Sequence, residues 1–224
     1  MFDLIKGFFN NSKFKPRVIQ VYKKQITRMD VIEANVGLFN NKMLEWKNWT
    51  HIIEHHSYTK DGQIKDTTGI WKYHTSYRID GNAVSKEVFY DRLKNKKGTT
   101  FELPDLTIGY NALIEEVNNQ IVVYSGRPLT MNGAHTKLWN SKAVGICWIG
   151  AFDFAEPSPE KYEVYAITTK KYMKVFSIPI QNILGHREAN AKVGLPYKSC
   201  PGKAVDMDKF RSLVEKIPDS KLVS

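Results

Sequence analysis

The sequence predicts a mixed α/β fold in which a central mixed β-sheet is flanked by helices, with a basic segment in front of it. Two observations lead to this prediction. Short apolar segments typical of strands alternate along the chain with segments of helical periodicity. Hydrophobic residues form 42% of the 224 residues and aromatic residues 12%, which is ample for a packed core. A sheet covered by helices also leaves the loops at its strand ends free to build a site.

The chain divides into an expected basic extension, residues 1–46, and an expected folded domain, residues 47–224. Residues 1–28 hold seven lysines and arginines against one aspartate, a surplus of six that is more than half of the net charge of +10. The apolar residues of "MFDLIKGFFNN" follow a helical spacing and predict a short amphipathic helix. Such a helix would either dock on the core or insert into a membrane or envelope surface.

The first half of the folded domain predicts strands, a helix and an irregular stretch. "WTHIIE", residues 49–54, has the composition of a strand, and "DTTGIWKYH", residues 66–74, that of a helix. Residues 79–105 are polar and rich in lysine, show little periodicity and are interpreted as an excursion from the fold. Residues 110–127 contain two apolar runs around "VNNQ", whose asparagines tolerate the backbone of a tight hairpin turn.

The second half predicts one buried strand and two capped helices. "AVGICWIG", residues 143–150, is a continuous apolar run and predicts the strand. Ser158 and Pro159 suit the cap and first turn of a helix that continues until "SIP". Asp206 would cap the last helix, and Pro218 would end it.

The charge and the apolar pattern limit the classes of function. A net charge of +10 favours an anionic partner, which could be nucleic acid, an anionic lipid surface or a bacterial wall polymer. No run approaches the roughly 18–20 apolar residues of a membrane-spanning helix, and the start has no signal-peptide pattern. We therefore expect a soluble chain that begins at or near Met1.

Two cysteines are too few for a disulfide scaffold in a chain of this length. A single bridge between Cys147 and Cys200 is conceivable, but Cys147 lies in the apolar run and is expected to pack in the core. Cys200 has polar and basic neighbours. Lys198 in particular would lower the pKa of its thiol and favour the thiolate that a metal prefers.

The six histidines include candidates for a catalytic zinc site, which takes three protein ligands and leaves a position for water. His55, at the expected exit of the first strand, is a better candidate than His51. His74 is expected to form a hydrogen bond at the end of its helix. The spacing from His186 to Cys200 is too long for a zinc finger, so a structural zinc is not expected.

Four motifs, in order, resemble the type 2 N-acetylmuramoyl-L-alanine amidase family, which includes phage amidase endolysins and animal peptidoglycan recognition proteins. They are "IIEHHS", "IGYNALIE", "GRPLTMNGAHTKLWNSKAVGICWIG" and "ILGHREANAKVGLPYKSCPG", and they cover about residues 49–210. The departures are the N-terminal extension, the excursion at 79–105, and Asn111, where a histidine often follows the tyrosine of the family.

The resemblance implies a set of metal ligands and catalytic helpers. His55, His186 and Cys200 would bind Zn²⁺, whereas His56 would not. Tyr110 and Lys198 would assist catalysis. The charge of Lys198 would stabilise the oxyanion that develops on the amide carbonyl, and Tyr110 would either orient the water or donate a hydrogen bond to that oxyanion.

The remaining candidates, apart from Glu188, have two interpretations each. His135, Thr136 and Asn140 would line the substrate groove or brace a loop. Arg127 would bind a carboxylate of the stem peptide or cap the hairpin. Glu188 is a candidate partner that holds the ring of His186 in one tautomer.

We therefore expect a zinc-dependent peptidoglycan amidase, in particular a phage or prophage endolysin. It would be a monomer that waits in the host cytoplasm until it is released to the cell wall. Residues 1–28 could contact the anionic envelope. The alternatives are a peptidoglycan recognition protein that binds without cutting and, from charge alone, a nucleic-acid-binding protein. No nucleic-acid motif accompanies the basic residues, so nucleic acid is not expected as the main partner.

Overall fold

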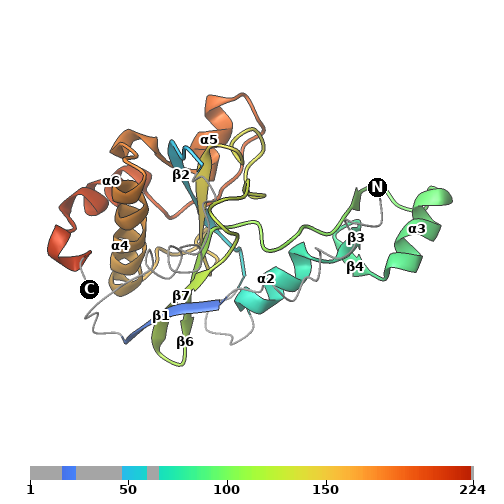
Figure 1. Ribbon diagram of the computed structural model, residues 1–224, viewed down its shortest axis with the longest axis horizontal. Helices are drawn as coiled ribbons and strands as arrows, with labels where there is room; N and C mark the ends of the chain where they lie inside the picture. Colours follow the sequence, from blue (N-terminus) through green and yellow to red (C-terminus); the bar gives the residue numbers. More distant parts are fainter. Residues whose placement is uncertain (1–16, 24–46, 60–65, 223–224) are drawn as a thin grey trace.

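The computed structural model describes the backbone of residues 17–23 and all atoms of residues 47–59 and 66–222, apart from the side chain of residue 66. A six-stranded sheet has the order β1-β7-β6-β8-β2-β9 and lies at the centre (Figure 1). Its central strands β6, β8, β2 and β9 are parallel, whereas β7 is antiparallel to both β6 and β1. The predicted mixed sheet is confirmed. Its strands are β1 (Arg17–Lys23), β2 (His51–His56), β6 (Ala112–Val117), β7 (Gln120–Ser125), β8 (Ala143–Trp148) and β9 (Ile183–Gly185).

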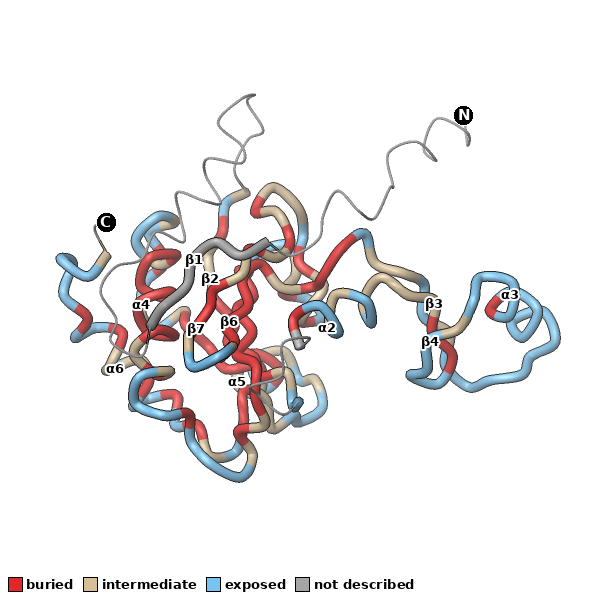
Figure 2. Tube along the Cα trace, turned by 90° about the horizontal axis from the view of Figure 1, so that it is seen from below, coloured by how far each residue is buried: buried red, intermediate tan, exposed pale blue. Residues whose placement is uncertain are grey.

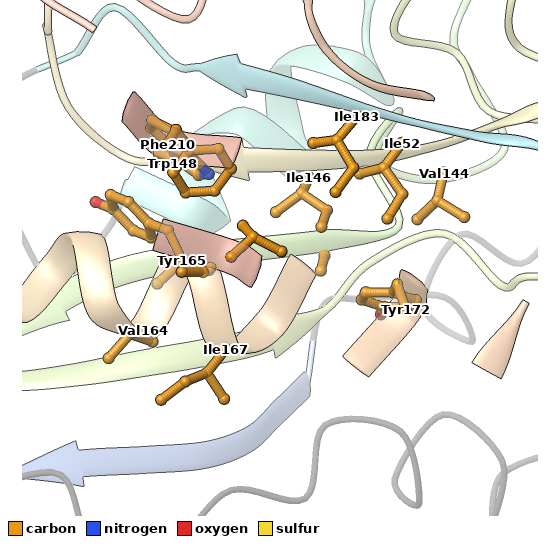
Figure 3. Packing of buried hydrophobic residues seen from close by; sticks show 14 of the residues in the cluster. Ile52, Val144, Ile146, Trp148, Val164, Tyr165, Ile167, Tyr172, Ile183 and Phe210 are labelled. Carbon is orange, nitrogen blue, oxygen red and sulfur yellow. The ribbon is translucent and has the colours of Figure 1, made fainter. Parts of the chain in front are cut away.

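Helices cover both faces of the sheet. On one face lie α4 (Pro159–Val175) and α6 (Met207–Lys216), whose apolar side chains join those of the sheet in the main core. Figure 3 shows this core, in which the rings of Trp148 and Tyr165 stack with their centroids 4.5 Å apart. The helices α2 (Asp66–His74) and α5 (His186–Lys192) contribute to smaller clusters that include Ile53 and Leu113.

Strand alternation decides which side chains of β2 face which layer. Ile52 belongs to the core under α4, whereas its neighbour Ile53 belongs to the cluster beside α5. Because successive side chains point to opposite faces, Glu54 shares the face of Ile52 and His55 shares the face of Ile53. Glu54 accordingly accepts hydrogen bonds from Trp148 and from Thr169 of α4.

The expected turns and caps are present. Asn118 and Asn119 both have positive φ, at 51° and 59°, between the antiparallel strands β6 and β7. The Ser158 side chain accepts a hydrogen bond from the Lys161 amide, with Pro159 in the first turn of α4. Asp206 caps α6, which ends at Lys216 before Pro218. Two short 3₁₀ helices, Ile180–Asn182 and Asp219–Lys221, complete this part of the fold.

The first expected strand is displaced along the chain. It was expected at 49–54, and β2 runs from His51 to His56. Trp49 instead precedes the strand, with its buried ring donating a hydrogen bond to the carbonyl oxygen of Leu129. The displacement brings His55 inside the strand rather than beyond its exit.

The excursion has a fold of its own. It contains the strands β3 (Tyr77–Ile79), β4 (Asn82–Val84) and β5 (Phe101–Glu102), which form a three-stranded sheet, and the helix α3 (Lys86–Lys94). Figure 2 shows that this sheet and helix extend away from the main body, with exposed chain around most of α3. Its buried apolar residues are few, chiefly Ile79 and Phe89.

Strand β1 comes from the region expected to be an extension. Its backbone pairs with β7 from Arg17 opposite Ser125 to Lys23 opposite Gln120, so it forms the edge of the main sheet. The amphipathic helix expected at the start of the chain lies outside the described residues. Within the described residues, no helix has both the length and the apolar character needed to cross a bilayer.

Candidate metal centre

Three side chains from distant parts of the sequence converge at one end of the sheet. They are His55 of β2, His186 at the start of α5, and Cys200 in the loop before α6. One ligand atom from each residue lies within 4.8 Å of the others. His55 Nδ1 is 3.5 Å from Cys200 Sγ, and the rings of His55 and His186 have their centroids 4.7 Å apart. The three residues can therefore contact one common ion.

The sheet topology explains the convergence of the two histidines. Strands β2 and β9 are parallel neighbours, paired through Glu54 and Gly185, so their carboxyl ends meet at the same edge. His55 is the residue after Glu54, and His186 is the residue after Gly185. Two positions that are 131 residues apart in sequence are thus brought together by ladder pairing.

Arg187, next to a candidate ligand, holds the loop that carries Cys200. Its amide donates to the Cys200 carbonyl at 2.9 Å, and its guanidinium donates to the carbonyls of Ser199 and Gly202 at 3.2 Å and 2.7 Å. The Cys200 sulfur in turn accepts from the His56 amide at 3.4 Å. Arg187 was not among the residues predicted from the sequence. Its adjacency to His186 was the available signal.

Burial sets the protonation of the two imidazoles. It lowers the pKa of His55 well below the usual value, with further lowering from His135, His186 and Lys198. Burial followed by the charge of Lys198 lowers the pKa of His186 to about 4. Both rings are therefore neutral near pH 7, which is the form that binds a metal ion.

The thiol of Cys200 behaves differently from the expectation. Lys198 does lower its pKa, as does the His56 amide, but burial has the larger effect and raises the pKa to about 12. The expected net lowering is therefore wrong for the protein alone. A cation placed between the three residues would favour the thiolate, because its positive charge compensates for the solvation that the buried sulfur lacks.

The proposed helpers lie beside this cluster. The Tyr110 ring is next to that of His55, with centroids 5.1 Å apart, and burial raises the pKa of its hydroxyl well above the usual value. The hydroxyl thus stays protonated and can donate a hydrogen bond. The Lys198 side chain is exposed, and its charge acts on His55, His186 and Cys200.

A hollow of about 460 Å³ adjoins the cluster at Tyr110. It opens between the residues that follow β2, including Ser57 and Thr59, and the α2 residues Tyr73 and His74. A larger hollow of about 710 Å³ lies between α4 and α6, and neither hollow is lined by His55, His186 or Cys200. The smaller hollow is the one that includes Tyr110, whose ring contacts that of His55.

A polar group lies on the Nε2 side of His55 and consists of His135, Thr136 and Asn140. His55 Nε2 lies 3.1 Å from His135 Nδ1 and 3.2 Å from the Thr136 hydroxyl. The Asn140 side-chain oxygen accepts from the amides of both His135 and Thr136 at 2.9 Å. In this arrangement the three residues brace one another and His55.

Arg127 and Glu188 lie in structural networks. Arg127 is 5% exposed and donates to the carbonyls of Thr107, Ile108 and Asn132, with Asp105 at 3.3 Å. Glu188 accepts from the Gly185 amide and from Arg211. Arg127 thus holds loop carbonyls in this structure, and the partners of Glu188 are groups other than His186.

Asn190, rather than Glu188, is the polar residue of α5 that acts on His186. It lies one helical turn after His186, and its side chain raises the pKa of His186 against the larger effect of burial. Its amide nitrogen donates to the Pro196 carbonyl at 2.7 Å. The i, i+4 spacing was the sequence signal for this proximity.

The other histidines and the second cysteine have clear partners. His51 packs edge-on against Trp139, His56 accepts from the Phe152 amide, and His74 accepts from the Gly109 amide at 2.8 Å. Cys147 is fully buried, as expected from its apolar strand, and both cysteines are free thiols.

The chain belongs to the N-acetylmuramoyl-L-alanine amidase family. The family model matches residues 45–203, which is more than half of the chain and includes all three clustered residues. The fold and the family model therefore define a protein of the amidase class. No curated protein matches the chain.

Solved structures that resemble the chain include N-acetylmuramoyl-L-alanine amidase LysC from Clostridium intestinale. It is 17% identical with a TM-score of 0.45, and the match covers 76% of this chain and 93% of that chain. Drosophila PGRP-LB is 18% identical with a TM-score of 0.46, and the match covers 79% and 85%. The complex of PGRP-LCa and PGRP-LCx with tracheal cytotoxin gives 19% identity and a TM-score of 0.45, with coverage of 79% and 88%.

Proposed function

We propose that the chain is a zinc-dependent hydrolase that cleaves the amide bond between N-acetylmuramic acid and L-alanine in peptidoglycan. The convergence of His55, His186 and Cys200 is the observation that carries this proposal. Imidazole nitrogens and a cysteine thiolate are donors that catalytic zinc sites use. When bound, zinc would activate a water molecule and polarise the carbonyl of the scissile amide.

The protein side chains would then act on the charge that develops on the carbonyl oxygen. Lys198 is exposed at the edge of the cluster, so its ammonium group is free to approach that oxygen. Tyr110 would orient the water or donate its hydroxyl hydrogen to the same oxygen. Such preorganised donors stabilise the transition state more than the ground state.

Within this function we propose the role of a phage or prophage endolysin that acts as a monomer on the bacterial wall. The basic residues among 1–28 would favour contact with an anionic envelope. The protein would wait in the host cytoplasm until it reaches the wall.

The test is the mass of the product that the zinc-loaded protein releases from a defined muropeptide. The proposal predicts free stem peptide that begins with L-alanine, and loss of this product after zinc is removed and its recovery when zinc is restored. Undiminished cleavage by protein shown to be free of metal would reject the metal mechanism. Tight binding of the muropeptide with no cleavage would identify a recognition protein instead.

A further inference from the structure

The ring of His135 contacts the ring of His55 on its Nε2 side. Its Nε2 lies 3.2 Å from the carbonyl oxygen of Ala143, and its Nδ1 lies 3.1 Å from Nε2 of His55. A carbonyl oxygen can only accept a hydrogen bond, so Nε2 of His135 carries the hydrogen. In the neutral ring, Nδ1 of His135 is then an acceptor directed at His55.

This acceptor determines where His55 carries its own hydrogen. A hydrogen on Nε2 of His55 is donated to Nδ1 of His135. A hydrogen on Nδ1 of His55 would leave two nitrogen lone pairs facing each other at 3.1 Å. The Thr136 hydroxyl, 3.2 Å from the same His55 nitrogen and 3.1 Å from Nδ1 of His135, supplements the first arrangement. The lone pair of His55 Nδ1 then faces Cys200.

From this geometry we propose that His135 is a positioning residue that holds His55 in the tautomer whose Nδ1 is free to bind the metal ion. The inference deepens the proposed function, because it concerns the same centre. It assigns His135 and its carbonyl partner Ala143 to the support of the metal ligand rather than to the substrate. Partners of this kind fix ring orientation and raise the affinity of a site for its metal.

Two glycines make room for the His135 ring. A Cβ atom added at Gly145 or at Gly133 would come within 2.5 Å of a ring carbon of His135. Gly145 lies in the middle of the buried strand β8, where a glycine weakens the strand unless another group must approach closely. Asn140 fixes the backbone of the same loop through the His135 and Thr136 amides. The two glycines thus leave space for the ring, and Asn140 holds the loop that carries it.

The experiment compares two substitutions that have opposite consequences under the proposal. His135→Phe preserves an aromatic ring but removes the acceptor, whereas His135→Asn places an amide oxygen near the position of Nδ1 and preserves an acceptor. We expect zinc affinity, measured by competition with a chromophoric chelator, to fall 10- to 100-fold in the Phe variant and by much less in the Asn variant. A space-filling role predicts the reverse order, and that order would overturn the proposal.

His51→Phe is the matched control. His51 lies on the same face of β2 as His55 but packs against Trp139, so its replacement should leave the zinc affinity within about twofold of the parent. Thermal unfolding of the metal-free variants shows whether each has folded. Gly145→Ala should weaken zinc binding as well, because it displaces the ring while keeping every histidine.

Nitrogen NMR of the histidine rings tests the tautomer without metal or activity. In the metal-free parent near neutral pH, we expect His55 and His135 each to carry the ring hydrogen on Nε2. A hydrogen on Nδ1 of His55 would overturn the inference even if the protein binds zinc and cleaves peptidoglycan. Conversely, a parent protein with the expected tautomers but no cleavage would contradict the proposed function and leave this inference standing.

Discussion

Lys198 is the residue whose proposed role in catalysis can be separated most cleanly from metal binding. Its side chain is exposed and contributes charge rather than a ligand atom. We expect Lys198→Met to reduce kcat by roughly a hundredfold or more, as loss of one oxyanion donor does, with zinc affinity changed far less.

Lys203→Met is the control for this change. Lys203 is also exposed and lies in the same loop, and its amide, which the substitution keeps, donates to Asp153. Steady-state hydrolysis of a muropeptide by both variants checks the prediction. Equal rates in the two variants would remove Lys198 from the mechanism.

At the same scale, the candidate ligands were easier to predict from the sequence than the residues that surround them. His55, His186 and Cys200 stand in motifs, so their types and order were visible. The side from which His135 approaches His55 was not visible in the sequence. It depends on the register of β8 against β2, in which His55 lies opposite Cys147. The direction of the Cys200 pKa was also missed, since burial of the loop outweighs the nearby Lys198.

The end of α6 depends on a buried lysine from α4. Lys170 is 7% exposed, and its ammonium donates to the carbonyl oxygens of Glu215 and Ile217 at 2.9 Å and 2.5 Å. Because α6 stops at Lys216, no amide of a following helical turn donates to these two carbonyl oxygens. We expect Lys170→Met to lower the free energy of unfolding by about 1–3 kcal/mol, because it leaves the carbonyls unpaired.

Lys174→Met, one turn further along α4, provides the comparison. Lys174 forms an exposed ion pair with Asp219, which typically contributes about 0–1 kcal/mol. Urea denaturation of both variants measures the difference. A larger loss for Lys174→Met than for Lys170→Met would contradict this description of the α4–α6 contact.

Asp80 organises the excursion. Its carboxylate accepts from the amides of Thr99 and Thr100 and from the Thr99 hydroxyl, which together lower its pKa to about 2. We expect Asp80→Asn to increase amide hydrogen exchange across residues 77–102 while the zinc affinity stays as in the parent. Asp91→Asn, within α3, should have only a local effect. Unchanged exchange in the Asp80 variant would show that other contacts hold the excursion together.

Elements with clear caps, turns or apolar spacing were predicted, whereas those without such local signals were missed. The caps and apolar spacing of α4 and α6 and the asparagine turn between β6 and β7 were visible in the sequence. The strands β3, β4 and β5 have only two or three residues each, which is too few to show an alternation. Strand β1 was not predicted, because its place in the sheet depends on pairing with β7, far away in the sequence.

The whole molecule should lose stability in mild acid when no metal is bound. Burial lowers the pKa of His74, His135 and His186 to about 4, and that of His55 well below 6.5. In the unfolded chain these rings take up protons near pH 6.5, whereas the folded protein resists protonation until about pH 4. Their contribution to stability is therefore complete above pH 6.5 and is lost as the pH falls towards 4.

The measurement is the free energy of unfolding as a function of pH. Each such ring contributes up to about 1.4 kcal/mol per pH unit across this window. His74→Gln should reduce the slope, because His74 must stay neutral to accept from the Gly109 amide. A stability that is constant between pH 6.5 and 4 would show that these histidines are not held neutral by the fold.

The location of zinc in crystals of the protein tests the central claim most directly. Anomalous diffraction recorded on the two sides of the zinc absorption edge should give a single strong peak within bonding distance of His55, His186 and Cys200, with His55 bound through Nδ1. A peak at other residues, or none in crystals soaked with zinc at neutral pH, would contradict the account.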